Sequence, residues 1–424
     1  MDKFIIRGGA RLKGSVKMSG SKNAALPIMA ASILADSPCE ILGVPDIRDI
    51  RTMSEILTSL GAEVNISGNT VKIDPSRINK FESPYTLVKK MRASIAVLGP
   101  LLGKFGKARV SFPGGCVIGS RPVDLHLKGL SEMGADIKIE HGYICADAGK
   151  LKGCEIFLGG YFGSSVLATA NVMMAAVRSE GVTVIESAAS EPEVVDLGNF
   201  LIKMGADING LGSHKIIITG VKSLKGVSHE IIPDRIEAAT FLIAGAICGD
   251  AITIENINPD HLKALSDAMR RAGISLSYSG GTVSVRSPER LFPVDIVTMP
   301  YPGFPTDVQA QMTALMCMTP GLSIITEKIY PERFMHVPEL ARMGARIHIE
   351  GASAIVKGVK KISGAPVMAS DLRASAALVL AGLAAEGETS ISRVYHIDRG
   401  YESIEKKLAL LGADIERVED KSGE

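Results

Sequence analysis

The stretch Lys22-Asn-Ala-Ala-Leu-Pro-Ile-Met-Ala-Ala-Ser-Ile-Leu34 is rich in alanine and is apolar on nearly every side of a helix. A helix without a polar face is buried inside its domain. Five further runs of this kind follow: Arg92 to Leu102, Ser165 to Val177, Asp234 to Cys248, Thr306 to Met318 and Asp371 to Leu380. We therefore expect six buried helices at regular intervals along the chain.

A short sequence motif with a central glycine repeats with a period of about 70 residues. This period is longer than the roughly 20 to 50 residues of most solenoid repeats. Its glycines are Gly61, Gly134, Gly205, Gly273, Gly344 and Gly412. Each is expected to close a helix. Amphipathic helices are expected at Ile50 to Leu60, Val195 to Met204 and His336 to Met343. Short β-branched segments such as Val182 to Ile185 and Ile252 to Ile254 are expected to be strands.

The repeat predicts an α/β fold with buried helices inside and with strands and amphipathic helices outside. Three units of this length fill a domain of about 210 residues, so six units give two pseudo-threefold domains. The first is expected at residues 21–232 and carries the loop around Cys116. The second is expected to combine residues 1–20 with 233–424, because Phe4 to Lys17 reads as strands that return to complete it.

The composition gives no sign of a macromolecular partner. Lysine and arginine total 47 against 46 aspartates and glutamates, so neither nucleic acid nor a membrane surface is implied. The six cysteines lack C-x-x-C and zinc-site spacing, which is typical of reduced thiols in a cytoplasmic protein. The N-terminus lacks the apolar core of a signal peptide, and no apolar run approaches the roughly 18 residues of a membrane span. Because nucleotide-binding, metalloprotease and nucleophile-elbow motifs are missing, we expect no cofactor and no catalytic metal.

One loop displays a single thiol, in the stretch Ser111-Phe-Pro-Gly-Gly-Cys116-Val-Ile-Gly-Ser-Arg121-Pro-Val-Asp124-Leu-His126. Its glycines and prolines favour a loop over a helix or strand. Arg121 and His126 are close in sequence, and cationic neighbours lower the pKa of a thiol, which would let Cys116 transfer a proton or act as a nucleophile. The alternative is a free cysteine beside a turn.

Three of the six buried helices open with a cation, at Lys22, Arg92 and Arg373. The helix macrodipole opposes a cation there, so the cation lowers stability unless an anion binds. If the helices of a domain point the same way, their N-termini form a positive face for a substrate carrying phosphate or carboxylate. The polar residues at these helix starts are interpreted first as N-caps, namely Ser21, Thr306, Asp307 and Ser370.

Several segments together resemble those of the enolpyruvyl transferases. They are Ser19-Gly-Ser-Lys22-Asn23-Ala-Ala-Leu26, Lys90-Met-Arg92-Ala-Ser94, the Cys116 loop, Pro233-Asp-Arg-Ile-Glu237, Pro302-Gly-Phe-Pro-Thr-Asp307, Arg333-Phe-Met-His336, Asp371-Leu-Arg-Ala-Ser375 and Asp398-Arg399-Gly-Tyr401. The resemblance spans nearly the whole chain and implies a two-domain inside-out α/β barrel with the active site between the domains. The implied reaction transfers the enolpyruvyl group of phosphoenolpyruvate to the 3′-hydroxyl of UDP-N-acetylglucosamine and releases phosphate, the first committed step of peptidoglycan synthesis.

The resemblance also implies roles for individual residues. Phosphoenolpyruvate would be bound by Lys22, Arg121 and Arg399, since cations suit its phosphate and carboxylate. Asp307 would accept the proton of the attacking hydroxyl. Cys116 would act as general acid toward the methylene carbon, or would trap the enolpyruvyl group as a thioether adduct; the resemblance leaves both open. The remaining substrate-binding set comprises Asn23, Arg92, Pro122, Val123, Asp124, Leu125, Ser165, Val166, Ile329, Asp371 and Arg373.

The implied partners are these two small molecules, and the sequence leaves the oligomeric state open. Leu167 stands where the family usually has a glycine whose backbone approaches the diphosphate, and the preceding segment Leu158 to Gly163 is slightly lengthened. Two alternatives follow: enolpyruvyl transfer to another acceptor such as shikimate 3-phosphate, or a weakly catalytic paralogue that binds the nucleotide sugar for regulation. The cysteine loop and the segment His396-Ile-Asp-Arg-Gly argue against shikimate 3-phosphate.

Overall fold

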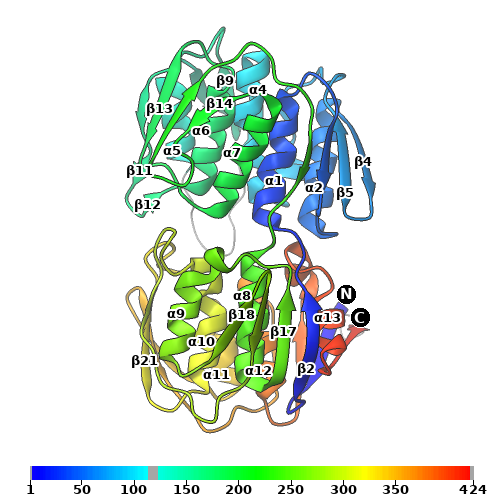
Figure 1. Ribbon diagram of the computed structural model, residues 1–424, viewed down its shortest axis with the longest axis vertical. Coiled ribbons are helices and arrows are strands. Elements are labelled where there is room, and N and C mark those ends of the chain that lie inside the picture. Colours follow the sequence, from blue (N-terminus) through cyan, green and yellow to red (C-terminus); the bar gives the residue numbers. More distant parts are fainter. Residues whose placement is uncertain (1, 113–122, 421–424) are drawn as a thin grey trace. The chain divides into compact units, whose positions relative to one another are not determined.

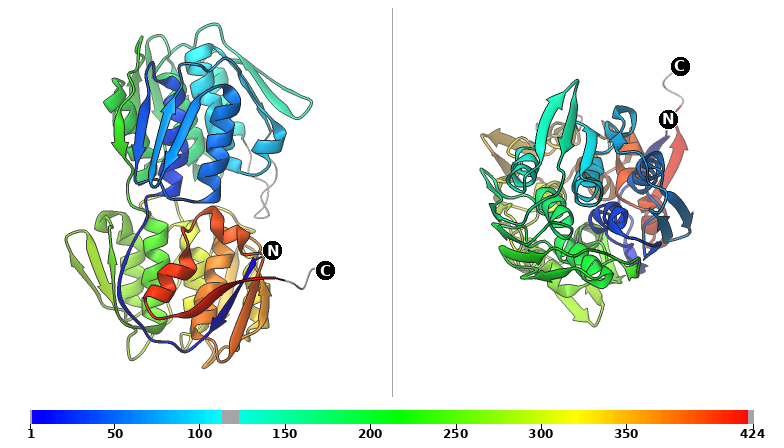
Figure 2. Two further views of the ribbon diagram at one scale, coloured as in Figure 1. Left: turned by 90° about the vertical axis from the view of Figure 1, so that its right-hand side faces the viewer. Right: turned by 90° about the horizontal axis from the view of Figure 1, so that it is seen from above.

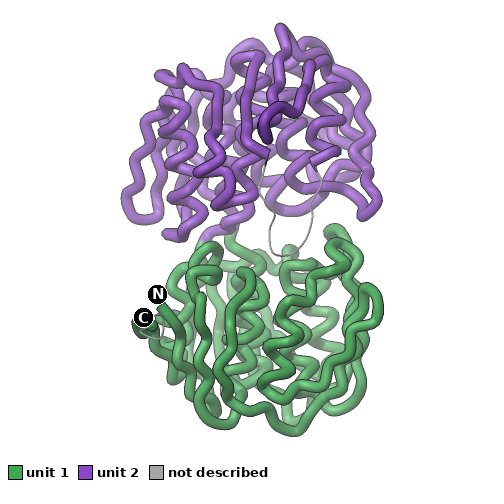
Figure 3. The backbone as a smooth tube through the Cα atoms, turned by 180° about the vertical axis from the view of Figure 1, so that it is seen from behind, with its two compact units in different colours: residues 1–19, 117–119, 233–424 green, residues 20–116, 120–232 purple. Residues whose placement is uncertain are grey.

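The computed structural model describes residues 2–112 and 123–420. Cys116, Arg121 and Pro122 therefore lie outside the described residues. The described chain divides into two compact units (Figure 3). Unit 1 contains residues 2–19 and 233–420, and unit 2 contains residues 20–112 and 123–232.

Unit 2 is built around three buried helices, α1 (Lys22–Ala31), α4 (Leu98–Phe105) and α6 (Val166–Ala176), and α6 packs against both of the others. The helices α2 (Arg48–Leu60), α5 (Asp124–Glu132) and α7 (Pro192–Met204) each have an exposed face. Shorter helices are η1 (Ser32–Leu34), α3 (Tyr85–Val88) and η2 (Arg92–Val97). Figure 1 shows the buried helices of this unit with strands outside them.

The strands of unit 2 form four-stranded sheets and one small hairpin. In spatial order the sheets are β16 (Ser228–Glu230), β3 (Cys39–Leu42), β5 (Thr70–Asp74) and β4 (Glu63–Ser67); β6 (Glu82–Ser83), β7 (Lys107–Ser111), β9 (Tyr143–Asp147) and β8 (Asp136–Glu140); and β10 (Glu155–Phe157), β13 (Val182–Glu186), β15 (Lys215–Thr219) and β14 (Asp207–Asn209). The hairpin pairs β11 (Gly159–Gly160) with β12 (Gly163–Ser164).

Unit 1 repeats this plan. Its buried helices are α8 (Arg235–Cys248), α10 (Gln309–Cys317) and α12 (Leu372–Ala384), and its half-exposed helices are α9 (Lys263–Arg271), α11 (Val337–Arg342) and α13 (Ile404–Leu410). Short 3₁₀ helices are η3 (Pro259–Leu262), η4 (Thr306–Val308) and η5 (Val394–Arg399). The three buried helices contact one another, and the sheets lie outside them (Figure 1).

The sheets of unit 1 include both N-terminal strands. In spatial order they are β24 (Pro366–Met368), β25 (Glu388–Ser392), β1 (Asp2–Arg7) and β26 (Asp414–Glu419); β18 (Leu276–Ser279), β19 (Thr282–Val285), β17 (Gly249–Glu255) and β2 (Leu12–Lys17); and β20 (Ile296–Val297), β21 (Leu322–Thr326), β23 (Ser353–Lys357) and β22 (Arg346–Glu350). Strand β1 lies between β25 and β26, so the two ends of the chain meet in one sheet (Figure 2).

The predicted arrangement of buried helices inside and strands outside is confirmed in both units. All six repeat glycines follow a helix with φ between 88° and 112°. A residue with a Cβ adopts this left-handed conformation only at a cost, which is why glycine stands there in every copy. The strands predicted at Val182 to Ile185 and Ile252 to Ile254 are β13 and the centre of β17.

The second buried helix differs from the prediction, because Arg92 to Val97 is a 3₁₀ turn before α4 begins. The side chain of Asn171 in α6 explains the change. In a continuous α-helix Gly99 N–H would donate to Ile95 O. Here Gly99 N–H donates to Asn171 Oδ1 (2.8 Å), and Asn171 Nδ2 donates to Ile95 O (3.0 Å). The amide is inserted into the hydrogen-bond ladder, and such insertions interrupt helices.

Replacing Asn171 with alanine should destabilise unit 2 by about 2–4 kcal/mol, because it leaves buried polar groups unpaired and opens a cavity. Asn209→Ala is the matched control, since Asn209 is exposed and bonds only weakly to Asp207 (3.3 Å); its effect should stay within about 0.5 kcal/mol. The chain has no tryptophan, so urea unfolding is followed by circular dichroism. Equal unfolding midpoints for the two variants would contradict the prediction.

Candidate functional site

The carboxylate of Asp307 is the centre of a charged cluster in unit 1. Asp307 lies in η4, Arg333 in the loop between β21 and α11, and Arg373 in the first turn of α12. Arg333 Nη1 donates to Asp307 Oδ1 at 2.8 Å, and Arg373 Nη2 donates to Asp307 Oδ2 at 3.0 Å. The two arginine side chains are only 6% and 4% exposed, whereas that of Asp307 is 27% exposed. One carboxylate with some access to solvent is thus shared by two buried cations.

These charges determine the protonation state of Asp307. Burial alone would raise its pKa, but the attraction of Arg373 and Arg333 outweighs burial and holds the pKa of Asp307 well below its usual value. The same carboxylate raises the pKa of both arginines, against the effect of burial. Asp307 is therefore ionised at neutral pH and can accept a hydrogen bond or a proton.

Asp371 and Tyr401 support the start of α12. Asp371 Oδ1 accepts hydrogen bonds from the backbone N–H groups of Arg373 (2.8 Å) and Ala374 (3.1 Å), which makes Asp371 the N-cap. The Tyr401 hydroxyl lies 3.3 Å from Arg373 Nη1 and 2.8 Å from the Thr240 hydroxyl. Arg373 is thus fixed at its backbone and at its side chain.

Three of the predicted N-caps are wrong. Asp371 caps α12 in place of Ser370, because its carboxylate reaches two N–H groups of the first turn. The Thr306 hydroxyl donates to Glu327 (2.8 Å), and the Asp307 carboxylate faces the two arginines, so neither caps a helix. Ser21 is confirmed as the N-cap of α1, where it accepts from Ala24 N–H.

Ile329 and Arg399 lie in separate segments of unit 1. Ile329 follows β21, and its backbone N–H donates to Glu327 Oε1 at 2.8 Å. Arg399 ends η5, and the next residue, Gly400, is packed so tightly against Leu372 that a Cβ would lie 2.5 Å from the Leu372 side chain. The η5 segment therefore lies beside the start of α12, where Asp371 and Arg373 also lie.

In unit 2 the Lys22 side chain is paired with a carboxylate. Lys22 begins α1, and its Nζ lies 2.8 Å from Oδ2 of Asp49 in the first turn of α2. This corrects the argument that Lys22 and Arg373 need a bound anion to offset the helix dipole. Asp49 neutralises the first cation, and Asp307 neutralises the second.

His126 does not supply the positive charge predicted beside Cys116. Gly99 N–H faces the amide oxygen of Asn171, so the amide nitrogen faces His126 and donates to its Nδ1 (2.8 Å). Burial, with a smaller effect of the Arg92 charge, lowers the pKa of His126 to about 3. At neutral pH the imidazole is uncharged, and its part in activating the thiol was predicted wrongly.

The other predicted residues of unit 2 lie at the starts of α5 and α6. Val123 is buried, and Asp124 is the exposed first residue of α5. Ser165 is the N-cap of α6 and accepts from Ala168 N–H (3.3 Å). The hairpin β11–β12 precedes it, and Gly160 approaches Leu125 so closely that a Cβ would meet the leucine side chain at 3.0 Å. These contacts bring Leu125 and the segment before Ser165 together.

Asn23 and Arg92 are half-buried residues near the helix starts of unit 2, and Val166 opens α6. Leu167 follows Val166, and its side chain packs against the hydrophobic core of unit 2. The leucine that replaces the usual glycine is thus accommodated by the core.

Sequence reasoning missed two carboxylates, and one of them left a signal. Asp49, Met53, Ile56 and Leu60 are spaced to share one face of α2, so an acid stands in an otherwise apolar stripe. A buried acid in such a position needs a cationic partner, which is Lys22. Glu327 has no comparable signal, because its side-chain partners Thr298 and Thr306 come from segments more than 20 residues away.

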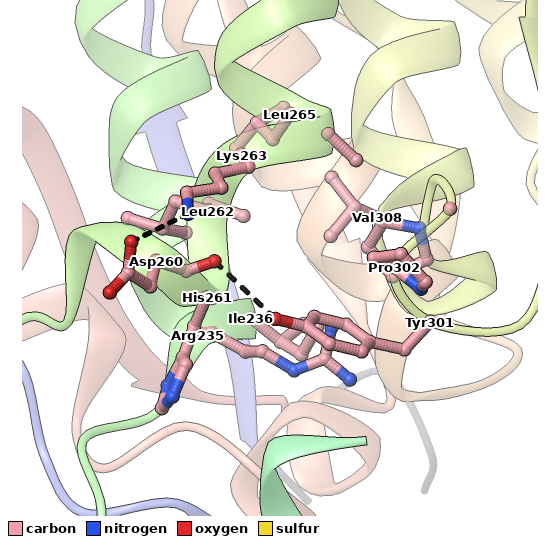
Figure 4. Close-up of a pocket in the computed structure, with 14 residues that line it drawn as sticks. Arg235, Ile236, Asp260, His261, Leu262, Lys263, Leu265, Tyr301, Pro302 and Val308 are labelled. Atoms are coloured by element: carbon pink, nitrogen blue, oxygen red, sulfur yellow. Dashed lines mark hydrogen bonds and ion pairs between the residues drawn. The ribbon is translucent and has the colours of Figure 1, made fainter. Parts of the chain in front are cut away.

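A small cavity of about 40 Å³ lies elsewhere in unit 1, between α8, the η3–α9 segment and the Tyr301–Pro305 loop (Figure 4). Lys263 pairs with Asp260 there (2.8 Å), and the Arg235 guanidinium lies over the Tyr301 ring. None of the predicted site residues lines this cavity.

In residues 2–112 and 123–420, no three His, Cys, Asp or Glu side chains are placed to hold a metal ion. No helix of that part is long and apolar enough to cross a membrane.

Known proteins resemble this chain along its whole length. The family described as EPSP synthase (3-phosphoshikimate 1-carboxyvinyltransferase) matches residues 6–408. A protein of Geotalea uraniireducens named UDP-N-acetylglucosamine 1-carboxyvinyltransferase is 57% identical over 420 residues, covering 99% of this chain and 100% of the relative. A protein of the same name from Akkermansia muciniphila is 50% identical over 423 residues, 99% of each chain.

Solved structures agree on the fold. The enolpyruvyl transferase NikO of Streptomyces tendae has a TM-score of 0.90 at 28% identity, over 98% of this chain and 99% of that chain. EPSP synthase from Acinetobacter baumannii has a TM-score of 0.73 at 17% identity, over 99% and 100% of the two chains, which is a likeness of fold alone. The predicted two-domain inside-out α/β barrel is confirmed by these likenesses.

Removing one of the two arginines tests the electrostatics of Asp307. Arg333→Met should raise the pKa of the Asp307 carboxyl toward its usual value, because burial continues to disfavour the charge while one cation is lost. The pKa is measured by carbon-13 NMR titration of aspartate carboxyls, with Asp307→Asn used for assignment. Arg342→Met, at an exposed arginine of α11, is the control and should change nothing. An unchanged Asp307 pKa in Arg333→Met would refute the assignment.

Proposed function

Because the chain belongs to the EPSP synthase (3-phosphoshikimate 1-carboxyvinyltransferase) family, we propose that it transfers the enolpyruvyl group of phosphoenolpyruvate to the 3′-hydroxyl of UDP-N-acetylglucosamine. Phosphate is released. The observation that carries this choice of acceptor is the name shared by full-length relatives that are identical at half or more of their positions. The reaction would serve as the first committed step of peptidoglycan synthesis, in the cytoplasm.

The proposed reaction has two steps. The 3′-oxygen of the sugar forms a bond to C2 of phosphoenolpyruvate, its proton passes to a base, and C3 gains a proton to become a methyl group. In the resulting ketal the C2–O bond to phosphate then breaks and C3 loses a proton, which restores the double bond. The catalyst must therefore bind two anionic substrates, accept a proton from oxygen and deliver a proton to carbon.

Asp307 fits the role of proton acceptor. It is ionised and partly exposed, and Arg333 and Arg373 fix both of its oxygens. A carboxylate with a strongly lowered pKa is a weak base, so a complete proton transfer before bond formation would be unfavourable. The proton is therefore transferred as the C2–O bond forms and the hydroxyl becomes acidic.

The remaining roles follow the family pattern. Lys22, Arg121 and Arg399 bind phosphoenolpyruvate, and the ion pair with Asp49 holds the Lys22 ammonium in place. Asn23, Arg92, Asp124, Leu125 and the Ser165–Val166 amides hold the nucleotide sugar, together with Pro122, Val123 and Ile329. Cys116 delivers the proton to C3 or forms a thioether adduct with the enolpyruvyl group. This thiol would be the target of alkylation by fosfomycin.

The activity is tested by phosphate release. Phosphoenolpyruvate with UDP-N-acetylglucosamine should give phosphate and an enolpyruvyl ether in equal amounts, whereas phosphoenolpyruvate with shikimate 3-phosphate should give neither. Product is identified by mass spectrometry. Turnover of shikimate 3-phosphate would replace the proposed acceptor, and tight binding of the nucleotide sugar without turnover would favour the regulatory paralogue.

Leu167 tests whether the departure from the family pattern affects the diphosphate. Because its side chain packs against the core, Leu167→Ala should lower the stability of unit 2 by about 1–2 kcal/mol. The KM for UDP-N-acetylglucosamine should change less than about twofold, since the side chain packs against the core. A large change in that KM at unchanged KM for phosphoenolpyruvate would mean that Leu167 contacts the nucleotide.

A further inference from the structure

Glu327 is a fully buried carboxylate that the proposed reaction does not use directly. It follows β21, its exposed fraction is 0%, and four donors surround it. Oε1 accepts from the Thr298 hydroxyl (2.5 Å), Ile329 N–H (2.8 Å) and Tyr330 N–H (3.0 Å), and Oε2 accepts from the Thr306 hydroxyl (2.8 Å). Among the described residues no cation pairs with it, so these neutral donors alone offset its burial.

The Glu327 oxygens accept every hydrogen bond around them: the two backbone amides can only donate, and both threonine hydroxyls already accept from another N–H and direct their own hydrogen to the carboxylate. The Thr306 hydroxyl must give its hydrogen to Glu327, and its lone pairs are left to face Arg333. Arg333 Nη1 uses one hydrogen on Thr306 Oγ1 (2.9 Å) and the other on Asp307 Oδ1 (2.8 Å). A continuous chain of directed hydrogen bonds therefore runs from Glu327 through Thr306 and Arg333 to Asp307.

The same carboxylate holds a second part of the site. Its Oε1 atom binds the backbone amides of both Ile329 and Tyr330 and so closes a turn after β21. Thr298 supports this turn from the other side, since its hydroxyl oxygen accepts from Lys328 N–H (2.9 Å). Ile329 belongs to the proposed nucleotide-sugar set. One buried group thus joins the proton acceptor to an acceptor-binding segment.

We propose that Glu327 is a positioning residue, which orients Arg333 on Asp307 through the Thr306 hydroxyl and fixes Ile329 through the turn amides. This inference rests on the proposed function, because it assigns Asp307 and Ile329 to the reaction given above. It adds a residue that touches neither substrate. Oε2 of Glu327 acts on kcat through Thr306, and Oε1 acts on the KM for the nucleotide sugar through the Ile329 turn.

The effect on Asp307 must be separated from other charges nearby. Arg373 holds the second oxygen of Asp307, and Tyr401 and Asp234 act on Arg373. Asp371 acts on Arg333. All of these groups remain in the variants described below, so a change in the pH profile is traced to the Glu327–Thr306–Arg333 chain.

Glu327→Gln is the first test. Its amide oxygen can keep the bonds to Thr298 and the turn, but its amide nitrogen then donates toward Thr306, which leaves the Thr306 hydroxyl without an acceptor and competes with Arg333. We expect kcat to fall about tenfold to a hundredfold, as for a displaced catalytic group. The acidic limb of the pH profile should move to higher pH, because a loosened Arg333 lowers the pKa of Asp307 less. The KM for UDP-N-acetylglucosamine should also rise, because the amide group holds the Ile329–Tyr330 turn less firmly than the carboxylate does.

Substitutions of Thr306 separate the two functions of Glu327. Thr306→Val removes the hydroxyl but leaves the Ile329 turn intact, so it should reduce kcat and shift the acidic limb without changing the KM for the nucleotide sugar. Thr306→Ser restores the hydroxyl and should restore both. The double variant Glu327→Gln/Thr306→Val should lower kcat no further than the more severe single variant, because both changes break one chain.

Thr326→Val is the matched control. Thr326 is the last residue of β21, directly before Glu327, and its hydroxyl pairs with the Ser353 hydroxyl (2.9 Å), outside the chain of bonds to Asp307. Its kinetic constants and pH profile should equal those of the wild type.

Three results would overturn the proposal. The first is a Glu327→Gln enzyme with the kcat and pH profile of the wild type. The second is a Thr306→Val enzyme that is less stable to heat but has normal kinetic constants. The third is a Thr306→Ser enzyme that is as impaired as Thr306→Val. If the wild type itself shows no turnover, the proposed function fails separately. The NMR titration of Asp307 in Glu327→Gln and Thr306→Val then decides, and an unchanged Asp307 pKa overturns the positioning role.

Discussion

The sharing of the Asp307 carboxylate between Arg333 and Arg373 is the constraint on which the chemistry of unit 1 depends. Each arginine is buried, and a buried cation is costly unless a counter-charge is fixed beside it. Asp307 supplies that charge to both, so three segments distant in sequence are held at one point: η4, the loop before α11 and the start of α12. The pseudo-threefold packing of α8, α10 and α12 brings these segments together.

Unit 2 follows the same rule with different residues. Lys22 at the start of α1 is matched by Asp49, and neutral hydrogen bonds replace ion pairs around Asn171 and His126. Two of the cations at the helix starts, Lys22 and Arg373, are therefore held by carboxylates of the fold itself. Their pairing gives them fixed directions before any substrate binds, and pre-oriented charges lose little entropy on binding. This preorganisation suits small anionic substrates such as phosphoenolpyruvate.

Much of the fold could be predicted from the sequence, because it is set by local patterns. All-apolar runs identify the buried helices, and the repeat glycines mark helix ends that require a positive φ. The 3₁₀ turn at Arg92 could not be foreseen, since Asn171 causes it from another helix. The pattern of polar residues at the helix starts singled out Asp307 and Arg373, and the family resemblance added their expected roles. The bonds of Glu327 and the neutral state of His126 depend on tertiary contacts, which leave no periodic signal.

The central proposal is that Asp307, ionised between two arginines, receives the proton of the sugar hydroxyl. Asp307→Asn tests it most directly in a comparison of nucleotide-sugar affinity with the rate of phosphate release. The account predicts a kcat at least about a hundredfold lower, the usual effect of losing a general base, while the Kd for UDP-N-acetylglucosamine changes only a few-fold. Asp267→Asn on the exposed face of α9 should leave both values unchanged. A normal rate in Asp307→Asn would contradict the account.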